Sequence, residues 1–103
     1  MFFASDNAGP VHPKVMERVI AANTDYAMPY GKDPIMDEVR AQIREQFEAP
    51  EAEVYLVATG TAANSLALAT LTQPFQTIFC TPPAHINVDE CNAPEFYTGG
   101  AKL

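Results

Sequence analysis

The sequence predicts an α/β fold with parallel strands joined by crossover helices. Two short apolar runs, residues 54–57 and 77–80, have the β-branched and aromatic bias of buried strands. Between them lies an Ala- and Leu-rich segment of strong helix formers, residues 62–71. A strand, a helix and a second strand in this order are typical of a right-handed parallel crossover.

The chain of 103 residues ends where a third strand is expected to begin, at residues 101–103. Two parallel strands do not make a closed architecture, because both faces of a parallel sheet need cover and more strands are needed. We therefore expect the chain to be the N-terminal portion of a larger α/β protein, incomplete on its own.

The composition narrows the class of protein. A chain that is 48% hydrophobic and 18% charged is globular rather than disordered. Its net charge of −7 and its lack of a basic cluster argue against nucleic-acid binding. No apolar run approaches the length of a membrane span, and the N-terminus does not have the pattern of a signal peptide. We expect a cytoplasmic protein with reduced Cys80 and Cys91 and no metal site.

Residues 1–50 are expected to form a loop and two helices that pack against a domain or another subunit. The polar stretch 5–10 is predicted to be a loop. His12 and Pro13 open the first helix, with His12 as a cap or solvent-facing residue. Asp33 and Pro34 open the second helix, which should end near residues 49–50, because the residue before a proline is pushed out of the α region.

Residues 51–103 are expected to begin the α/β domain, and their most informative feature is the turn Thr59-Gly60-Thr61. A strand that turns into a helix leaves free backbone N–H groups at the positive end of the helix dipole. Two hydroxyls and a glycine at that point predict a small anion site, with phosphate as the favoured occupant. The alternative is an ordinary crossover in which Thr59 or Thr61 only caps the helix. Neither the P-loop pattern nor the dinucleotide fingerprint is present.

The helix is predicted to break at residues 72–74, and His85 lies in the loop after the second predicted strand. Ligands of open α/β sheets bind at this end of the strands. A lone histidine there is commonly structural, but beside a phosphate site its flat ring is also suited to stacking on an aromatic cofactor. Asn87 is expected to cap a short helix that contains Glu90.

Four motifs then occur in order along the chain: residues 5–7 (Ser-Asp-Asn), residues 29–31 (Pro-Tyr-Gly) with Asp33, residues 59–64 (Thr-Gly-Thr-Ala-Ala-Asn), and residues 84–87 (Ala-His-Ile-Asn) with Glu90. In order and approximate spacing they resemble the low-specificity L-threonine aldolases. That family consists of pyridoxal 5′-phosphate (PLP) enzymes of fold type I, the aspartate aminotransferase fold. The resemblance runs along essentially all of this chain and covers the N-terminal minority of the family's length.

The resemblance implies a role for each matching residue. Thr59, Gly60 and Thr61 would bind the cofactor phosphate, and His85 would stack on the pyridine ring and assist proton transfer. Ser5 and Tyr30 would bind the substrate, Ser5 by its carboxylate and Tyr30 from a subunit interface near the site. Glu90 would have a supporting role only.

The resemblance also implies an activity, the retro-aldol cleavage of threonine-type β-hydroxy-α-amino acids to glycine and an aldehyde, in a homodimer or homotetramer. It places the Schiff-base lysine downstream of this segment, and Lys14, Lys32 and Lys102 do not match its position. We therefore expect this chain alone to be inactive. The alternatives are another fold-type-I enzyme, a β-eliminating lyase or an aminotransferase, and a non-catalytic fragment that pairs with a companion polypeptide.

Overall fold

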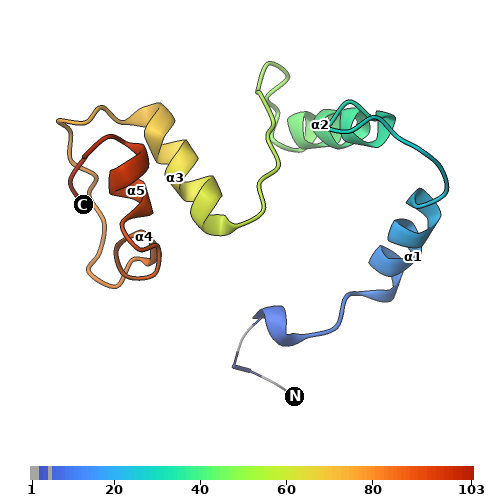
Figure 1. Ribbon diagram of the computed structural model, residues 1–103, viewed down its shortest axis with the longest axis horizontal. Helices are drawn as coiled ribbons and strands as arrows, with labels where there is room; N and C mark the ends of the chain where they lie inside the picture. The colour runs from blue at the N-terminus through green and yellow to red at the C-terminus, as the bar shows by residue number, and fades with distance from the viewer. Residues whose placement is uncertain (1–2, 5) are drawn as a thin grey trace. The chain divides into compact units, whose positions relative to one another are not determined.

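The computed structural model describes residues 3, 4 and 6–103, with the backbone alone for Asp6. The chain divides into two compact units, one ending at Ala52 and the other running from Glu53 to Leu103. The first unit holds the 3₁₀ turn η1 (Asp6–Ala8) and the helices α1 (Pro13–Ala22) and α2 (Pro34–Gln46). The second holds α3 (Gly60–Leu71) and two short helices, α4 (His85–Val88) and α5 (Ala93–Tyr97) (Figure 1).

The helices of the first unit begin where their capping signals predict. The His12 side chain accepts a hydrogen bond from the Lys14 N–H at 3.2 Å, and Pro13 occupies the first turn of α1. Asp33 accepts from the Met36 N–H at 2.9 Å, and Pro34 occupies the first turn of α2. These two predicted starts are confirmed, because a side-chain cap and a proline act locally on the backbone.

Helix α2 ends at Gln46, slightly before the predicted boundary at residues 49–50. Glu48 adopts a φ of 51°, in the left-handed region, directly after the Phe47 cap. The Glu48 N–H then donates to the Glu45 carbonyl at 3.1 Å, and the Ala49 N–H to the Arg44 carbonyl at 2.9 Å. This pair of bonds is the Schellman motif. The motif ends the helix at Gln46, before the position at which Pro50 would end it.

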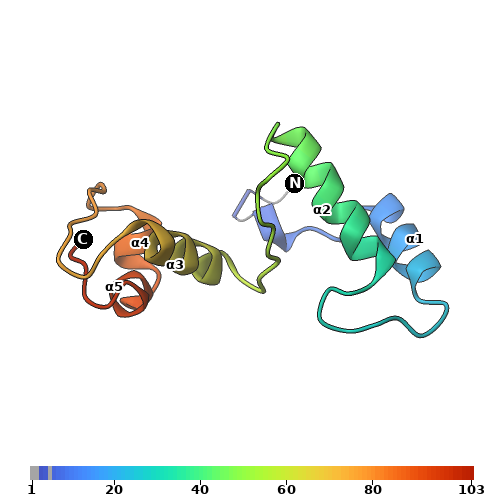
Figure 2. The ribbon, with the colours of Figure 1, turned by 90° about the horizontal axis from the view of Figure 1, so that it is seen from above.

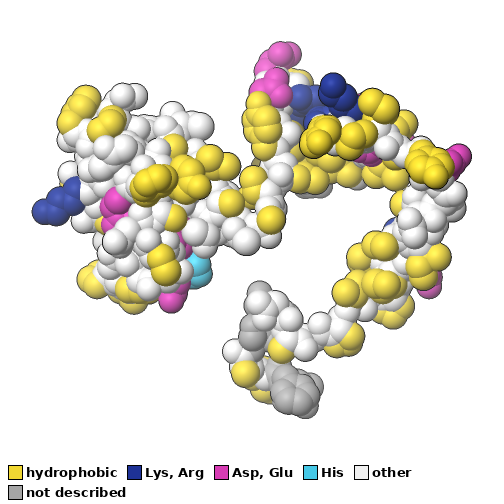
Figure 3. Space-filling view, viewed as in Figure 1, with side chains coloured by type: hydrophobic (Ala, Val, Ile, Leu, Met, Phe, Trp, Pro, Cys, Tyr) yellow, Lys and Arg dark blue, Asp and Glu magenta, His cyan; other side chains and the backbone are white. Residues whose placement is uncertain are grey.

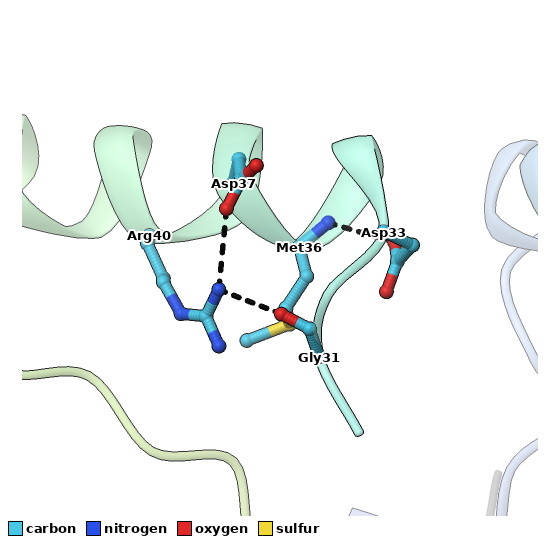
Figure 4. A network of polar contacts seen from close by, with 5 residues as sticks. All are labelled: Gly31, Asp33, Met36, Asp37 and Arg40. Carbon is cyan, nitrogen blue, oxygen red and sulfur yellow. Dashed lines mark hydrogen bonds and ion pairs between the residues drawn. The ribbon is translucent and has the colours of Figure 1, made fainter. Parts of the chain in front are cut away.

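A polar network in the first unit holds the turn that carries Tyr30 (Figure 4). Tyr30 and Gly31 have φ values of 62° and 69°, and two successive positive φ values are typical of a type I′ turn. Arg40 of α2 donates from Nη1 to the Gly31 carbonyl at 2.8 Å and to Asp37 at 3.2 Å. A Cβ at position 31 would lie 2.8 Å from Arg40 Nη2, the end of a flexible side chain that can shift, so the positive φ is what favours glycine there.

The apolar side of α1 is uncovered in the first unit. No described residue of this unit is buried, and the apolar side of α1 is exposed at Val15, Met16, Val19 and Ile20. Figure 3 shows apolar side chains on the surface over this helix. The predicted amphipathic helix is therefore confirmed, and no described residue of this unit buries its apolar side.

The second unit has a small core where α3 meets α5. These two helices are in contact, and they lie close together in both Figure 1 and Figure 2. The residues buried there are mostly small or polar: Ser65, Glu90, Pro94, Thr98 and Ala101. Thr98 Oγ1 donates to the Pro94 carbonyl at 2.8 Å and accepts from the Ala101 N–H at 3.2 Å, which ties the end of α5 to the segment that follows it.

The strands predicted at residues 54–57 and 77–80 are not confirmed, and this corrects the predicted parallel sheet. In the described part of the chain the second unit contains helices and one isolated parallel bridge, between Thr77 and Lys102. The bridge consists of an Ile78 N–H bond to the Lys102 carbonyl at 2.8 Å and a Lys102 N–H bond to the Gln76 carbonyl at 3.2 Å. The parallel direction is the one expected between residues 77–80 and a strand starting at 101–103.

The segment 54–57 has no such neighbour. Tyr55, Leu56 and Val57 are exposed, although the sequence predicted a buried strand. A strand exists only through hydrogen bonds to another strand, and none of the described backbone hydrogen bonds joins 54–57 to another segment. An apolar groove of about 650 Å³ remains open along this side of α3, lined by Glu53, Tyr55, Val57, Ala63, Leu66, Ala67, Ala69 and Thr70.

Two local predictions near the C-terminus are also wrong. The helix expected after an Asn87 cap instead begins at His85, and Glu90 lies after its end. The Asn87 side chain donates to the Pro82 carbonyl at 2.9 Å, so it stabilises the preceding turn. The helix α5 was not predicted.

None of the described helices has the length and apolar character needed to cross a bilayer.

Candidate functional site

The start of α3 presents two backbone N–H groups that no described residue accepts. Thr59 is extended and caps the helix, since its Oγ1 accepts from the Ala62 N–H at 3.1 Å. The Thr59 carbonyl accepts from the Ala63 N–H, also at 3.1 Å. These bonds satisfy two of the four N–H groups that a helix start leaves open. In the described part of the chain the N–H groups of Gly60 and Thr61 have no acceptor.

Gly60 keeps this helix start unobstructed. A Cβ at position 60 would meet no atom within 4 Å, so the chain's own packing does not require glycine there. The absence of a side chain instead leaves the N–H groups at the positive end of the dipole open to an approaching group. The predicted capping role of Thr59 is therefore confirmed, and the cap leaves the N–H groups of Gly60 and Thr61 exposed beside it.

A hollow of about 340 Å³ opens beside the start of α3. Its lining residues come from the first turns of α3 and from α5: Thr59, Thr61, Ala62, Ser65, Leu66, Ala93 and Tyr97. The Ser65 hydroxyl is fully buried and has no hydrogen-bond partner among the described residues. A buried hydroxyl without a hydrogen-bond partner is uncommon in protein interiors.

The second part of the site is a chain of three polar side chains that links α4 to α3. Glu90 Oε1 accepts from Asn64 Nδ2 at 2.7 Å and contacts His85 Nδ1 at 2.8 Å. Asn64 lies in the second turn of α3, and His85 is the first residue of α4. The Glu90 side chain is fully buried, whereas 63% of the His85 side chain is exposed. The ring of His85 is therefore held from its Nδ1 side and is accessible elsewhere.

This arrangement keeps Glu90 ionised. The hydrogen bond from Asn64 lowers the pKa of the Glu90 carboxyl below its ordinary value of 4.5, burial acts in the opposite direction, and the hydrogen bond and charge of His85 lower it further. The two donors outweigh the burial because both act on the charged form of the carboxylate. An anionic Glu90 can only accept hydrogen bonds, so the Asn64 amide and the His85 ring must both be donors.

The predicted site residues do not all lie in one unit. Thr59, Gly60, Thr61 and His85 belong to the second unit, where Asn64 and Glu90 connect His85 with the helix that begins at Gly60. Tyr30 belongs to the first unit, and its side chain is almost completely exposed, at 95%. Ser5 lies outside the described residues, so its predicted place by the substrate carboxylate stays a prediction.

Sequence reasoning assigned no contact to Asn64 and only a supporting role to Glu90. One signal was available: asparagine is a poor helix former, yet Asn64 occurs within an Ala- and Leu-rich helix. Such a residue inside a helix commonly has a side-chain partner. Its partner, Glu90, is 26 residues away, and no local pattern identifies a pair at that separation.

Comparison with known proteins defines the class first. The model of a family described as β-eliminating lyases, which are PLP-dependent proteins of fold type I, matches residues 3–103. The chain belongs to this β-eliminating lyase family. It is also similar to the low specificity L-threonine aldolase of Pseudomonas aeruginosa, with 41% identity over 101 residues, and to that of Pseudomonas sp. strain NCIMB 10558, with 40% identity over 101 residues.

These matches cover 98% of this chain but 29% of each relative. The chain therefore corresponds to a minority of the length of the aldolases it resembles. The residues present fit the phosphate end of PLP: two free N–H groups, the Thr59 and Thr61 hydroxyls and an open position at Gly60 stand at one helix N-terminus.

Proposed function

We propose that this segment supplies the phosphate site and the histidine of a PLP-dependent lyase that cleaves threonine-type β-hydroxy-α-amino acids to glycine and an aldehyde. One observation carries the proposal: the Asn64–Glu90–His85 chain attaches an exposed imidazole to the helix whose first two N–H groups are free. The 40–41% identity to two threonine aldolases supports this choice of substrate class.

In this proposal the backbone N–H groups of Gly60 and Thr61 bind the cofactor phosphate, with the hydroxyls of Thr59 and Thr61 beside them. The Thr59 oxygen already accepts from Ala62, so its hydroxyl proton is what it can offer to a phosphate oxygen. PLP, when bound, supplies an electron sink for the carbanion that forms at the α-carbon of the substrate.

His85 has two roles. Its exposed ring would stack on the pyridine ring of bound PLP, and its second nitrogen, Nε2, would take the proton of the substrate β-hydroxyl as the carbon–carbon bond breaks. A positioned histidine that moves a proton in this way contributes about 10²–10⁴-fold to a rate.

Ser5 and Tyr30 are the two proposed substrate-binding residues. Ser5 would lie near the substrate carboxylate. Tyr30 is presented by a turn that Arg40 holds at the Gly31 carbonyl, and its exposed ring is suited to a site shared with another subunit. The intact protein would accordingly be a homo-oligomer, a dimer or a tetramer.

β-Elimination is the second candidate activity, because the matching family model is described as a β-eliminating lyase. The two reactions differ in product. Aldol cleavage of L-threonine releases glycine, whereas elimination from serine or cysteine releases pyruvate. The purified protein that carries this segment, supplied with PLP, should release glycine. Pyruvate release without glycine release would contradict the aldolase proposal.

Two variants at position 85 sharpen the assay. His85→Phe keeps an aromatic face for the cofactor but has no nitrogen to take a proton, so we expect retained cofactor binding and about 10²–10⁴-fold slower glycine release. His85→Ala should also weaken cofactor binding. Equal glycine release by His85→Phe and the parent protein would refute the proton-transfer role.

A further inference from the structure

We propose that Glu90 is the positioning residue of His85: it fixes the imidazole as the Nδ1–H tautomer and leaves the Nε2 lone pair free. This inference rests on the proposed function, since it assigns the state in which His85 would meet the substrate. It concerns a contact within this chain, so it can be tested without cofactor or substrate.

One carboxylate oxygen of Glu90 makes both contacts. Asn64 and His85 both contact Oε1 of Glu90, at 2.7 and 2.8 Å. The other oxygen, Oε2, is buried and has no partner among the described residues. The orientation of the carboxylate therefore depends on Asn64, which anchors it to α3, and the carboxylate in turn sets the direction of the His85 ring.

The proton of a neutral His85 must then lie on Nδ1. A carboxylate has no hydrogen to donate, so the 2.8 Å contact is a hydrogen bond only if Nδ1 carries the proton. In a neutral imidazole the other nitrogen is then unprotonated. Nε2 can accept one proton, and the resulting imidazolium charge is balanced by the buried Glu90 carboxylate.

His12 provides an internal contrast. Its Nδ1 accepts a hydrogen bond from the Lys14 N–H at 3.2 Å, so its Nδ1 must be unprotonated and its proton must lie on Nε2 when the ring is neutral. The chain has two histidines. The structure thus assigns them opposite tautomers, and the partner of Nδ1 alone accounts for the difference.

The test is a long-range ¹H–¹⁵N correlation spectrum of the imidazole rings in the cofactor-free chain, at a pH where both rings are neutral. We expect the Nδ1–H pattern for His85 and the Nε2–H pattern for His12. The same Nε2–H pattern at both rings in the parent chain would overturn the proposal, whatever any variant shows.

Three variants assign the effect to Glu90. Glu90→Ala removes the acceptor, and His85 should lose the Nδ1–H pattern. Asn64→Ala keeps the acceptor, so the pattern should persist with broader signals. Asp89→Asn removes a neighbouring negative charge that makes no described side-chain contact with His85, and should change nothing. An unchanged His85 in Glu90→Ala, or an equal change in Asp89→Asn, would overturn the role of Glu90.

These outcomes are separate from those of the proposed function. A correct tautomer pattern in a protein that releases only pyruvate would keep the positioning role and reject the aldolase. Glycine release by a protein whose His85 shows the Nε2–H pattern would keep the aldolase proposal and reject the positioning role of Glu90.

Discussion

Replacing Thr59 by Ala tests whether the start of α3 is organised as a cap beside an open anion site. Thr59 Oγ1 accepts from the Ala62 N–H at 3.1 Å, and alanine cannot replace that bond. Loss of a threonine N-cap costs about 1 kcal/mol of helix stability. A change of that size corresponds to about a fivefold change in the ratio of closed to open helix.

Thr61→Ala is the matched control for this substitution. The Thr61 hydroxyl makes no described hydrogen bond and lies inside the first turn of α3. Alanine is the stronger helix former by up to about 0.7 kcal/mol, so this variant should leave the helix unchanged or slightly more stable. The two threonines therefore have opposite predicted signs, although both were assigned to the same anion site.

Amide hydrogen exchange of α3 measures the difference, because exchange from a helix reports its local opening free energy. Protection of the α3 amides should fall about fivefold in Thr59→Ala and should not fall in Thr61→Ala. Thr59→Ser should retain the protection of the parent chain, since serine caps as well as threonine. Equal losses in Thr59→Ala and Thr61→Ala would refute the division of roles.

Two further predictions concern the polar networks. The pKa of Glu90 is lowered, so the stability that its carboxylate gives to the link between α3 and α4 should be complete above pH 4.5 and be lost as the pH falls through the pKa of the folded chain. Amide exchange near Glu90 should show this loss of protection at acid pH. Glu90→Gln should abolish the pH dependence. Gly31→Ala puts a residue with a Cβ at a φ of 69°, so it should destabilise the turn by about 1 kcal/mol, as measured by amide exchange at the start of α2. Gly9→Ala, whose Cβ would meet no atom within 4 Å, should have little effect.

The helices were predictable because their signals are local. The His12–Pro13 and Asp33–Pro34 pairs and Thr59 each fix a helix start through groups at most three residues away. There are two exceptions. Helix α4 begins at His85 and not after Asn87, and α5 begins after Asn92, which has a left-handed conformation that the sequence does not predict.

The strands were not confirmed because a strand depends on partners distant in sequence. Residues 54–57 have the expected apolar character, but side chains such as Tyr55 and Leu56 are exposed and the segment has no described ladder. The Thr77–Lys102 bridge supports this explanation, because parallel pairing is present where two segments lie side by side. The relatives are more than three times as long as this chain, so most of their residues have no counterpart in it.

The candidate site was predictable in part. The Thr-Gly-Thr turn indicated an anion site through its chemistry, and the open N–H groups of Gly60 and Thr61 agree with that hypothesis. The contact of His85 with Glu90, and of Glu90 with Asn64, joins segments whose separation in sequence hides their proximity. Only the fold of residues 64–90 reveals it.

The most direct test of the account compares pyridoxamine 5′-phosphate with pyridoxamine by following the backbone amide signals of this chain. These amines are suitable probes because they lack the aldehyde through which PLP reacts with surface lysines. We expect the amide signals of Gly60 and Thr61 to shift with pyridoxamine 5′-phosphate and to stay in place with pyridoxamine. Equal shifts with both compounds, or no shift with either, would contradict the claim that the start of α3 binds the cofactor phosphate.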